Sequence, residues 1–128
     1  MQIEHVAIWC QDLEQMRTFY EEYFGGRANQ KYVNARGFNS YFLHFEQGAR
    51  LELMQWPQVN QVKNSASSEF LGLGHLAFSL GSREAVDRLT TRLVQDGFER
   101  LSGPRVTGDG YYESCLLDPE LNCIELCA

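Results

Sequence analysis

The sequence predicts an α+β fold in which two tandem βαβββ modules form a curved mixed sheet with the helices outside it. The first observation is an internal repeat, because residues 3–8 (IEHVAI) match residues 73–78 (LGHLAF) at an offset of 70. The second is a helical pattern of apolar residues after each of these segments. The third is the series of extended, aromatic-rich segments after each helical pattern, which gives each half the order β-α-β-β-β.

The first module begins with an apolar run at residues 3–8 that is typical of a buried strand. Asp12 is expected to cap the following helix, and Gly25 and Gly26 to end it. Apolar side chains at helical spacing turn one face of this helix toward a core: Leu13, Met16, Phe19, Tyr20 and Tyr23. Three extended segments follow, at about residues 28–33, 39–46 and 50–56. Gln47 and Gly48 supply the turn between the last two segments.

The second module repeats this order from residue 73. Ser82 takes the N-cap position of its helix, and Gly97 is expected to end that helix. The apolar side chains that match those of the first helix are Val86, Leu89 and Leu93. Three extended segments follow, at about residues 98–101, 111–117 and 123–127. Residues 118–122 (DPELN) carry the turn chemistry between the last two segments.

The two modules are expected to form a single domain over residues 1–128, because each half alone would bury too small a core. Module one spans about residues 1–56, and module two spans about residues 71–128. The segment between them, about residues 57–70, is polar and lacks periodicity, so it predicts a solvated linker.

The composition excludes several classes of partner. The chain has 11 Lys and Arg against 17 Asp and Glu, a net charge of −6 and a pI near 5.0, so we expect no nucleic-acid partner. No apolar run approaches the about 20 residues that span a bilayer, and no secretory signal is visible, so we expect no membrane association and a cytoplasmic location. The four cysteines contain no C-x-x-C pair and are expected to be ordinary thiols rather than an all-cysteine zinc site.

Each module carries one histidine and one glutamate at equivalent positions. His5 and His75 occupy the same place in the repeated strand, and the Glu52 of LEL recurs as the Glu125 of IEL. Neighbouring residues of a strand point to opposite faces of the sheet. If the branched residues beside each glutamate face the helices, both carboxylates point to the concave face, and the same alternation turns both histidines there.

These side chains predict a metal site. Two carboxylates and two imidazoles in one concavity are costly to bury unless they are paired, protonated or coordinated. A divalent cation satisfies all of them, and Ni, Zn or Co are the expected ions, with Mn or Fe as alternatives. Taken singly, each residue also fits a satisfied strand histidine or a solvated glutamate. His44 has no counterpart in the other module and fits the surface or a pocket wall.

Four segments carry a resemblance to a known family: residues 4–8 (EHVAI), 12–20 (DLEQMRTFY), 74–78 (GHLAF) and 118–126 (DPELNCIEL). They resemble the vicinal-oxygen-chelate superfamily, which holds glyoxalase I, bleomycin-resistance proteins, fosfomycin-resistance enzymes, methylmalonyl-CoA epimerases and extradiol dioxygenases. The set His5, Glu52, His75 and Glu125 is similar to the metal ligands of glyoxalase I. Residues 103–108 (GPRVTG) are similar to the glycine-proline loop that precedes its second-half hairpin.

The resemblance implies a metal-dependent lyase or isomerase that acts on a small α-oxo or α-hydroxy carbonyl compound or its thiol adduct. The metal would bind the substrate's oxygens and stabilise an enediolate, while a glutamate moves a proton between adjacent carbons. Either Glu52 or Glu125 can be this base, and the family analogy favours Glu125. The resemblance also implies a homodimer.

Two departures from the family pattern bear on the substrate. Trp9 occupies the strand position at which the glutathione-using bacterial glyoxalases that this chain resembles have an arginine. That arginine reaches the carboxylate of the tripeptide. Residues 53–57 (LMQWP) lack the asparagine that those enzymes tend to place soon after the second ligand. The substrate can therefore be the adduct of a thiol other than glutathione, or a compound without a thiol.

The sequence also offers candidates for a substrate pocket over the metal: Trp9, Met54, Trp56, Tyr111 and Tyr112. Core or dimer packing is the alternative for each of these residues. Arg105 is a candidate for holding a substrate carboxylate, because a guanidinium binds that group through two parallel hydrogen bonds. A solvated loop arginine is the alternative interpretation of Arg105.

Two other functions are kept beside the enzyme hypothesis. One is the binding and sequestration of an aromatic or drug-like ligand without catalysis, which Trp9 and the 12% aromatic content favour. The other is epimerase or dioxygenase chemistry with the same metal. A non-haem iron oxygenase normally presents two histidines and one carboxylate, so a fourth ligand counts against that choice.

Overall fold

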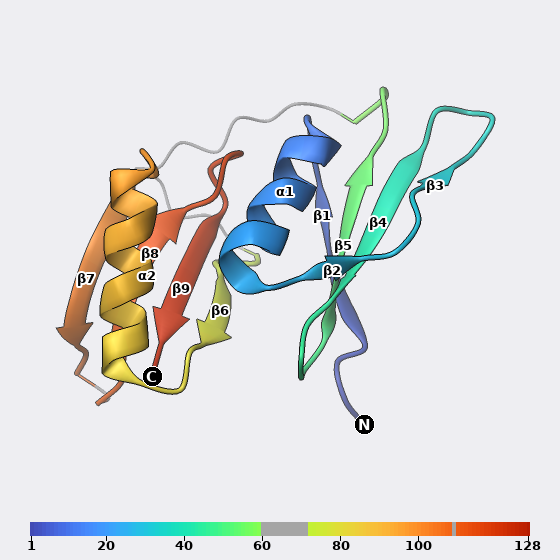
Figure 1. The fold of residues 1–128 in the computed structure, drawn as a ribbon. Helices are drawn as coiled ribbons and strands as arrows, with labels where there is room; N and C mark the ends of the chain where they lie inside the picture. The colour runs from blue at the N-terminus through green and yellow to red at the C-terminus, as the bar shows by residue number, and fades with distance from the viewer. Residues whose placement is uncertain (60–71, 109) are drawn as a thin grey trace. The chain divides into compact units, whose positions relative to one another are not determined.

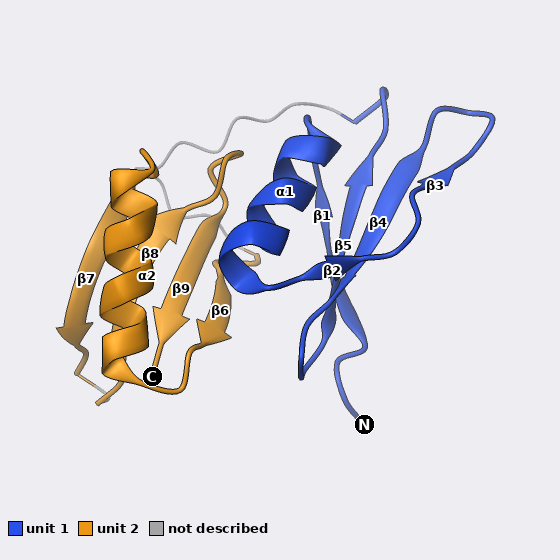
Figure 2. Cartoon of the chain, in the orientation of Figure 1, with its two compact units in different colours: residues 1–62 blue, residues 63–128 orange. Residues whose placement is uncertain are grey.

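The computed structural model describes residues 1–59, 72–108 and 110–128. The chain divides into two compact units, residues 1–62 and 63–128 (Figure 2). Each unit holds one helix and one mixed sheet, which confirms the predicted α+β fold of tandem βαβββ modules. Of the predicted linker, residues 60–70 lie outside the described part of the chain.

The first unit consists of a sheet and one helix, with bounds β1 (His5–Trp9), α1 (Leu13–Phe24), β2 (Arg27–Ala28), β3 (Tyr32–Val33), β4 (Asn39–His44) and β5 (Arg50–Gln55) (Figure 1). The strand order is β1-β5-β4-β2, and β3 also pairs with β4. Strands β1 and β5 run parallel, whereas the other pairs are antiparallel. The first and last strands of the module are therefore neighbours at the edge of the sheet.

Helix α1 begins and ends where the sequence predicts. The Asp12 side chain accepts a hydrogen bond of 2.9 Å from the Gln15 backbone N–H, and Gly25 closes the helix in a left-handed conformation at φ +67°. The buried face of α1 consists of Leu13, Met16, Phe19 and Tyr20. It packs on β4 and β5, whose buried apolar residues are Leu43, Leu51 and Leu53. This packing fixes which face of β5 turns away from the core.

The second unit repeats the arrangement, with bounds β6 (Leu76–Ser79), α2 (Arg83–Gln95), β7 (Arg100–Val106), β8 (Tyr112–Leu117) and β9 (Cys123–Cys127). Its strand order is β6-β9-β8-β7, and β6 and β9 form the parallel pair. The Ser82 side chain caps α2 by accepting from the Ala85 backbone N–H at 3.2 Å. Thr90 of α2 and Ser114 of β8 share a buried hydrogen bond of 2.6 Å, which ties helix to sheet.

Some strand boundaries differ from the sequence prediction. The predicted strand at 28–33 forms two short strands, β2 and β3. Strand β6 begins at Leu76, so His75 directly precedes the strand rather than lying inside it. The segment predicted as a loop at 103–108 is mostly strand, because β7 continues to Val106.

Gly103 gives the physical reason for the longer strand. It adopts φ +75°, and a Cβ atom there would clash with the Glu113 carbonyl oxygen and lie 2.8 Å from the Ser114 Cα. Only glycine lets β7 approach β8 so closely, and the β7–β8 register shifts between Ser102 and Arg105, the interval that contains Gly103. The glycine-proline pair, which suggests a loop in the sequence, therefore lies within an irregular strand in the structure.

Among the described residues, no helix combines the length and the hydropathy that a bilayer crossing needs. The four cysteines, all in the described part of the chain, form no disulfide with one another.

Candidate metal centre

The first half of the candidate site lies on β1 and β5 of unit 1. Leu51 and Leu53 are buried against the helix side, so Glu52 between them turns to the opposite face of the sheet. His5 opens β1 and shares this face. The His5 Nε2 lies 3.8 Å from the Glu52 Oε2, and only 15% of the Glu52 side chain is exposed. The structure therefore brings together the histidine and the glutamate of this module.

Neighbouring side chains orient His5. Its Nδ1 contacts the carboxylate of Glu4, which the Arg50 guanidinium also contacts. The hydrogen bond with His5 is the main cause that lowers the pKa of Glu4. The Phe42 ring packs edge-on against the imidazole at 5.4 Å between centroids. A ligating histidine is commonly held by such a partner at its other nitrogen, which leaves Nε2 directed at the ligand side.

Sequence reasoning missed Glu4 and Arg50. Arg50 pairs with His5 in the β1–β5 register and lies two residues before Glu52, so strand alternation places it on the same face. Extending the alternation argument from the glutamate to its whole strand would have found this arginine.

The second half of the candidate site lies in unit 2 and matches the first. Glu125 sits on β9 between the buried Ile124 and Leu126, and His75 precedes β6. The His75 Nε2 lies 3.6 Å from the Glu125 Oε2, and 16% of the Glu125 side chain is exposed. Each module therefore holds one imidazole close to one largely buried carboxylate.

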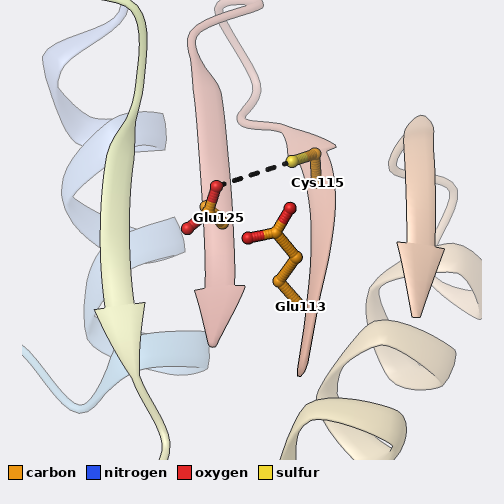
Figure 3. A group of neighbouring side chains, drawn as sticks. All are labelled: Glu113, Cys115 and Glu125. Carbon is orange, nitrogen blue, oxygen red and sulfur yellow. Dashed lines mark hydrogen bonds between the residues drawn. The ribbon is translucent and has the colours of Figure 1, made fainter. Parts of the chain in front are cut away.

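Two further side chains that the sequence analysis did not select accompany Glu125. Cys115 lies opposite Glu125 in the β8–β9 register, and its Sγ donates to Glu125 Oε2 at 4.0 Å. Glu113 extends from β8 toward the same place (Figure 3). Burial raises the pKa of the Cys115 thiol. The signal was the alternation of β8, where Ser114 and Leu116 are buried, so that Glu113 and Cys115 turn to the other face.

The predicted pocket residues of unit 1 lie together. Trp9 pairs with Met54 in the β1–β5 register, and its indole stacks on Trp56 with centroids 6.5 Å apart. Phe38, which sequence reasoning missed, meets Trp9 edge-on at 6.1 Å. Trp9 is 45% exposed although aromatic rings surround it. Trp9 of this aromatic cluster lies four residues along β1 from His5, on the same face of the sheet.

The predicted pocket residues of unit 2 are not brought together. The Tyr112 hydroxyl donates to Asp87 Oδ1 at 2.6 Å, and the Arg83 guanidinium lies 5.1 Å from the centre of its ring. Tyr112 therefore faces α2, on the opposite side of the sheet from Glu125. Tyr111 precedes β8 and is exposed. Arg105 is exposed on β7, opposite Glu113 in the register.

Both histidine–glutamate pairs have the chemistry and spacing of metal ligands. Imidazole nitrogens and carboxylate oxygens bind Zn²⁺ at about 2.0–2.2 Å, so two such atoms on one ion lie at most about 4.4 Å apart. The observed separations of 3.8 Å in unit 1 and 3.6 Å in unit 2 satisfy this limit. The residues present thus fit a divalent cation.

Comparison with known proteins agrees with this chemistry. The family model described as Glyoxalase/Bleomycin resistance protein/Dioxygenase superfamily matches residues 2–126. The chain belongs to this superfamily. Its members generally bind a divalent metal and small-molecule substrates and often form dimers, and the superfamily includes many enzymes.

Individual relatives in the superfamily are similar along most of the chain. The uncharacterized protein YwkD of Bacillus subtilis is 32% identical over 98 residues, which cover 76% of this chain and 73% of that protein. A structure of a possible glyoxalase from Bacillus cereus is 26% identical, with a TM-score of 0.72 and coverage of 100% of this chain and 99% of the other. The trypanothione-dependent glyoxalase I of Leishmania major shares the fold, with a TM-score of 0.77, 21% identity and coverage of 99% and 86%.

Proposed function

We propose that this superfamily member is a divalent-metal-dependent lyase or isomerase of the glyoxalase I type. Its substrate is a small α-oxo or α-hydroxy carbonyl compound or the thiol adduct of one. The observation that carries the proposal is the occurrence of one close histidine–glutamate pair in each module, at equivalent positions. We propose that His5, Glu52, His75 and Glu125 are ligands of a divalent cation, with Ni, Zn or Co expected and Mn or Fe as alternatives.

The protein's own residues divide the chemistry between binding and proton transfer. When bound, the cation supplies a Lewis acid for the negative charge that develops on the substrate's oxygens. A glutamate removes the proton from the carbon beside the carbonyl, which gives an enediolate, and returns that proton to the neighbouring carbon. A positioned carboxylate base contributes about 10² to 10⁴ in rate. Glu125 is our choice for this base, with Glu52 as the alternative.

The aromatic cluster on unit 1 supports a substrate with an apolar part. The cluster lies on the same face as His5 and Glu52. Trp9 follows His5 by four residues, Met54 follows Glu52 by two, and Trp56 stacks on Trp9. Apolar walls with few polar anchors are typical of small-molecule sites. We propose that these side chains hold the substrate's apolar group and that Arg105 holds a carboxylate. An exposed tryptophan in place of an arginine favours a thiol other than glutathione or a substrate without one.

Calorimetric titration of the metal-stripped protein with Ni²⁺, Co²⁺ and Zn²⁺ tests the metal site. Wild type should bind about one ion per chain. Glu52→Gln and Glu125→Gln should bind the ion at least about tenfold more weakly. Mutating a residue that only hydrogen-bonds to a metal ligand already lowers metal affinity about tenfold or more. Glu46→Gln is the matched control, because Glu46 is exposed and belongs to neither pair.

Turnover of hemithioacetals and related carbonyl compounds tests the reaction. Activity should require the added ion, and Glu125→Gln should lower kcat by about 10² to 10⁴. The proposal fails if both glutamate variants keep wild-type metal uptake and wild-type turnover.

A second function, sequestration of an aromatic ligand without catalysis, is favoured by the exposed Trp9 in its cluster of rings. Quenching of tryptophan fluorescence by planar aromatic compounds separates the two functions. Tight binding by the metal-stripped protein supports sequestration, whereas affinity that disappears with the metal supports the enzyme.

We further propose a cytoplasmic location. The absence of a disulfide among the four cysteines, which is usual in a reducing compartment, supports this proposal.

A further inference from the structure

The glutamate of unit 2 belongs to a second group of ligand atoms besides its pair with His75. Cys115 and Glu113 extend from β8 on the same side as Glu125 (Figure 3). One carboxylate oxygen of each glutamate and the Cys115 sulfur all lie within 4.8 Å of one another. The Oε2 of Glu125 is 4.0 Å from this sulfur and 3.6 Å from the His75 Nε2. A nitrogen atom of His75, the sulfur of Cys115 and a carboxylate oxygen of Glu113 therefore all lie near the Glu125 carboxylate.

A cysteine lies opposite the glutamate in unit 2 but not in unit 1, so the internal repeat does not predict this sulfur atom. In unit 1 the residue opposite Glu52 is Phe42, in the register position that Cys115 holds opposite Glu125. Phe42 cannot ligate, and its ring instead packs against His5. The two modules thus share the histidine and the glutamate but differ in the side chain beside the glutamate.

The surroundings of the group favour a cation. Glu113, Cys115 and Glu125 are all partly buried. Two carboxylates at this distance repel one another when both are charged, and a bound cation reverses that repulsion. A thiolate beside carboxylates and an imidazole is a donor set that suits zinc and its thiophilic neighbours rather than Mg²⁺ or Mn²⁺, which prefer oxygen.

We propose that Glu113, Cys115 and Glu125 bind a thiophilic divalent cation such as Zn²⁺, Co²⁺ or Cd²⁺ through a metal–sulfur bond. The inference deepens the proposed function and rests on it in part, because Glu125 belongs to both ligand sets. On binding, the Cys115 S–H bond breaks, the proton passes to solvent, and the sulfur lone pair forms the bond to the cation. The oxidation states of sulfur and metal do not change.

Cobalt substitution tests this ligand set directly. Addition of Co²⁺ to the metal-stripped protein should produce the near-ultraviolet charge-transfer absorption of a cobalt–thiolate bond. Cys115→Ser should lose this band, and Glu113→Gln should require more Co²⁺ to reach it. Absence of the band from wild type, or its persistence in Cys115→Ser, overturns the inference.

Two other thiols provide matched controls. Cys127 lies on β9 two residues from Glu125, but its Sγ donates to the Phe78 carbonyl at 3.5 Å. Cys10 is buried in unit 1. Cys127→Ser and Cys10→Ser should keep the full band, and a band that depends on either of them contradicts the assignment. Circular dichroism of each variant identifies any that does not fold, and Cys115→Ala then serves as the second test of the same sulfur.

Variants of unit 1 separate this inference from the proposed function. If the band forms and Glu52→Gln leaves metal affinity unchanged, the sulfur-containing set holds and the ligand set shared by the two modules fails. If the band is absent and Glu52→Gln weakens binding, the shared set holds and the sulfur-containing set fails.

Discussion

Gly103 is the residue that brings β7 against the strand that carries Glu113 and Cys115. Its φ of +75° lies in the left-handed region, and its Cα faces the backbone of Glu113 and Ser114 rather than a movable side chain. Neither the conformation nor the space allows another residue, because a backbone cannot move aside as a side chain tip can.

Gly103→Ala should therefore destabilise the protein by more than about 1 kcal/mol, as expected for alanine where the native φ is positive. Chemical denaturation monitored by circular dichroism measures the difference. Gly108→Ala is the control, because a Cβ at Gly108 meets no atom within 4 Å, and it should change stability by less than about 0.5 kcal/mol. Equal stability of the two variants would contradict the structural role of Gly103.

At the scale of residues, the sequence predicts those site members that the repeat duplicates. His5 and His75, with their glutamates, have counterparts in the other module, so alignment of the halves selects them. Cys115 and Phe38 have no matching side chain in the other module, and only the pairing of distant segments brings them beside the site. Tyr112 illustrates the same limit, because its orientation depends on the register of β8 and its contact with α2.

Among the elements, α1 is held to its sheet by a cluster of polar contacts around Glu14. The Glu14 carboxylate accepts hydrogen bonds from Lys31 at 2.8 Å, from Tyr41 at 3.0 Å and from Arg17 at 3.1 Å. The Lys31 hydrogen bond is the largest cause that lowers the pKa of Glu14 below its ordinary value. A carboxyl with a lowered pKa in the folded state stabilises that state above its unfolded pKa, and the contribution disappears as the pH falls through the folded pKa.

Glu14→Gln should accordingly cost less than about 1 kcal/mol at pH 7, because half of the side chain is exposed to solvent. The difference from wild type should shrink as the pH falls below the ordinary carboxyl value of 4.5, and it should vanish once the carboxyl is protonated in both states. Urea denaturation at several pH values measures this convergence. Glu84→Gln, at the first-turn position of α2, controls for the helix dipole alone. A difference for Glu14→Gln that stays constant with pH would refute this account.

Both helices illustrate how far local signals determine an element. Asp12 and Ser82 cap their helices as predicted, because capping depends on residues only three positions apart. Strand β7 depends on a partner strand, and pairing with β8 overrides the loop tendency of glycine and proline. Local chemistry therefore fixes the helix ends, whereas partners distant in sequence fix the strand ends.

For the whole molecule, we predict a homodimer. The superfamily often forms dimers, and exposed apolar side chains such as Leu101, Val106 and Tyr111 supply surface for association. Analytical ultracentrifugation at micromolar concentration should give twice the chain mass of 14.7 kDa. The metal-stripped and metal-loaded forms should be compared. The mass of a single chain in both forms would refute the prediction.

The parallel pairing of the first and last strands in each module has a consequence for folding. His5 meets Glu52, and His75 meets Glu125, only when the final strand of a module has joined its opening strand. These are contacts of high sequence separation, and the entropy of closing the intervening chain must be paid before they form. We therefore expect each histidine–glutamate pair to form late in the folding of its module. A metal ion that binds such a pair captures the completed module and slows its unfolding, but it cannot guide the earliest steps of collapse.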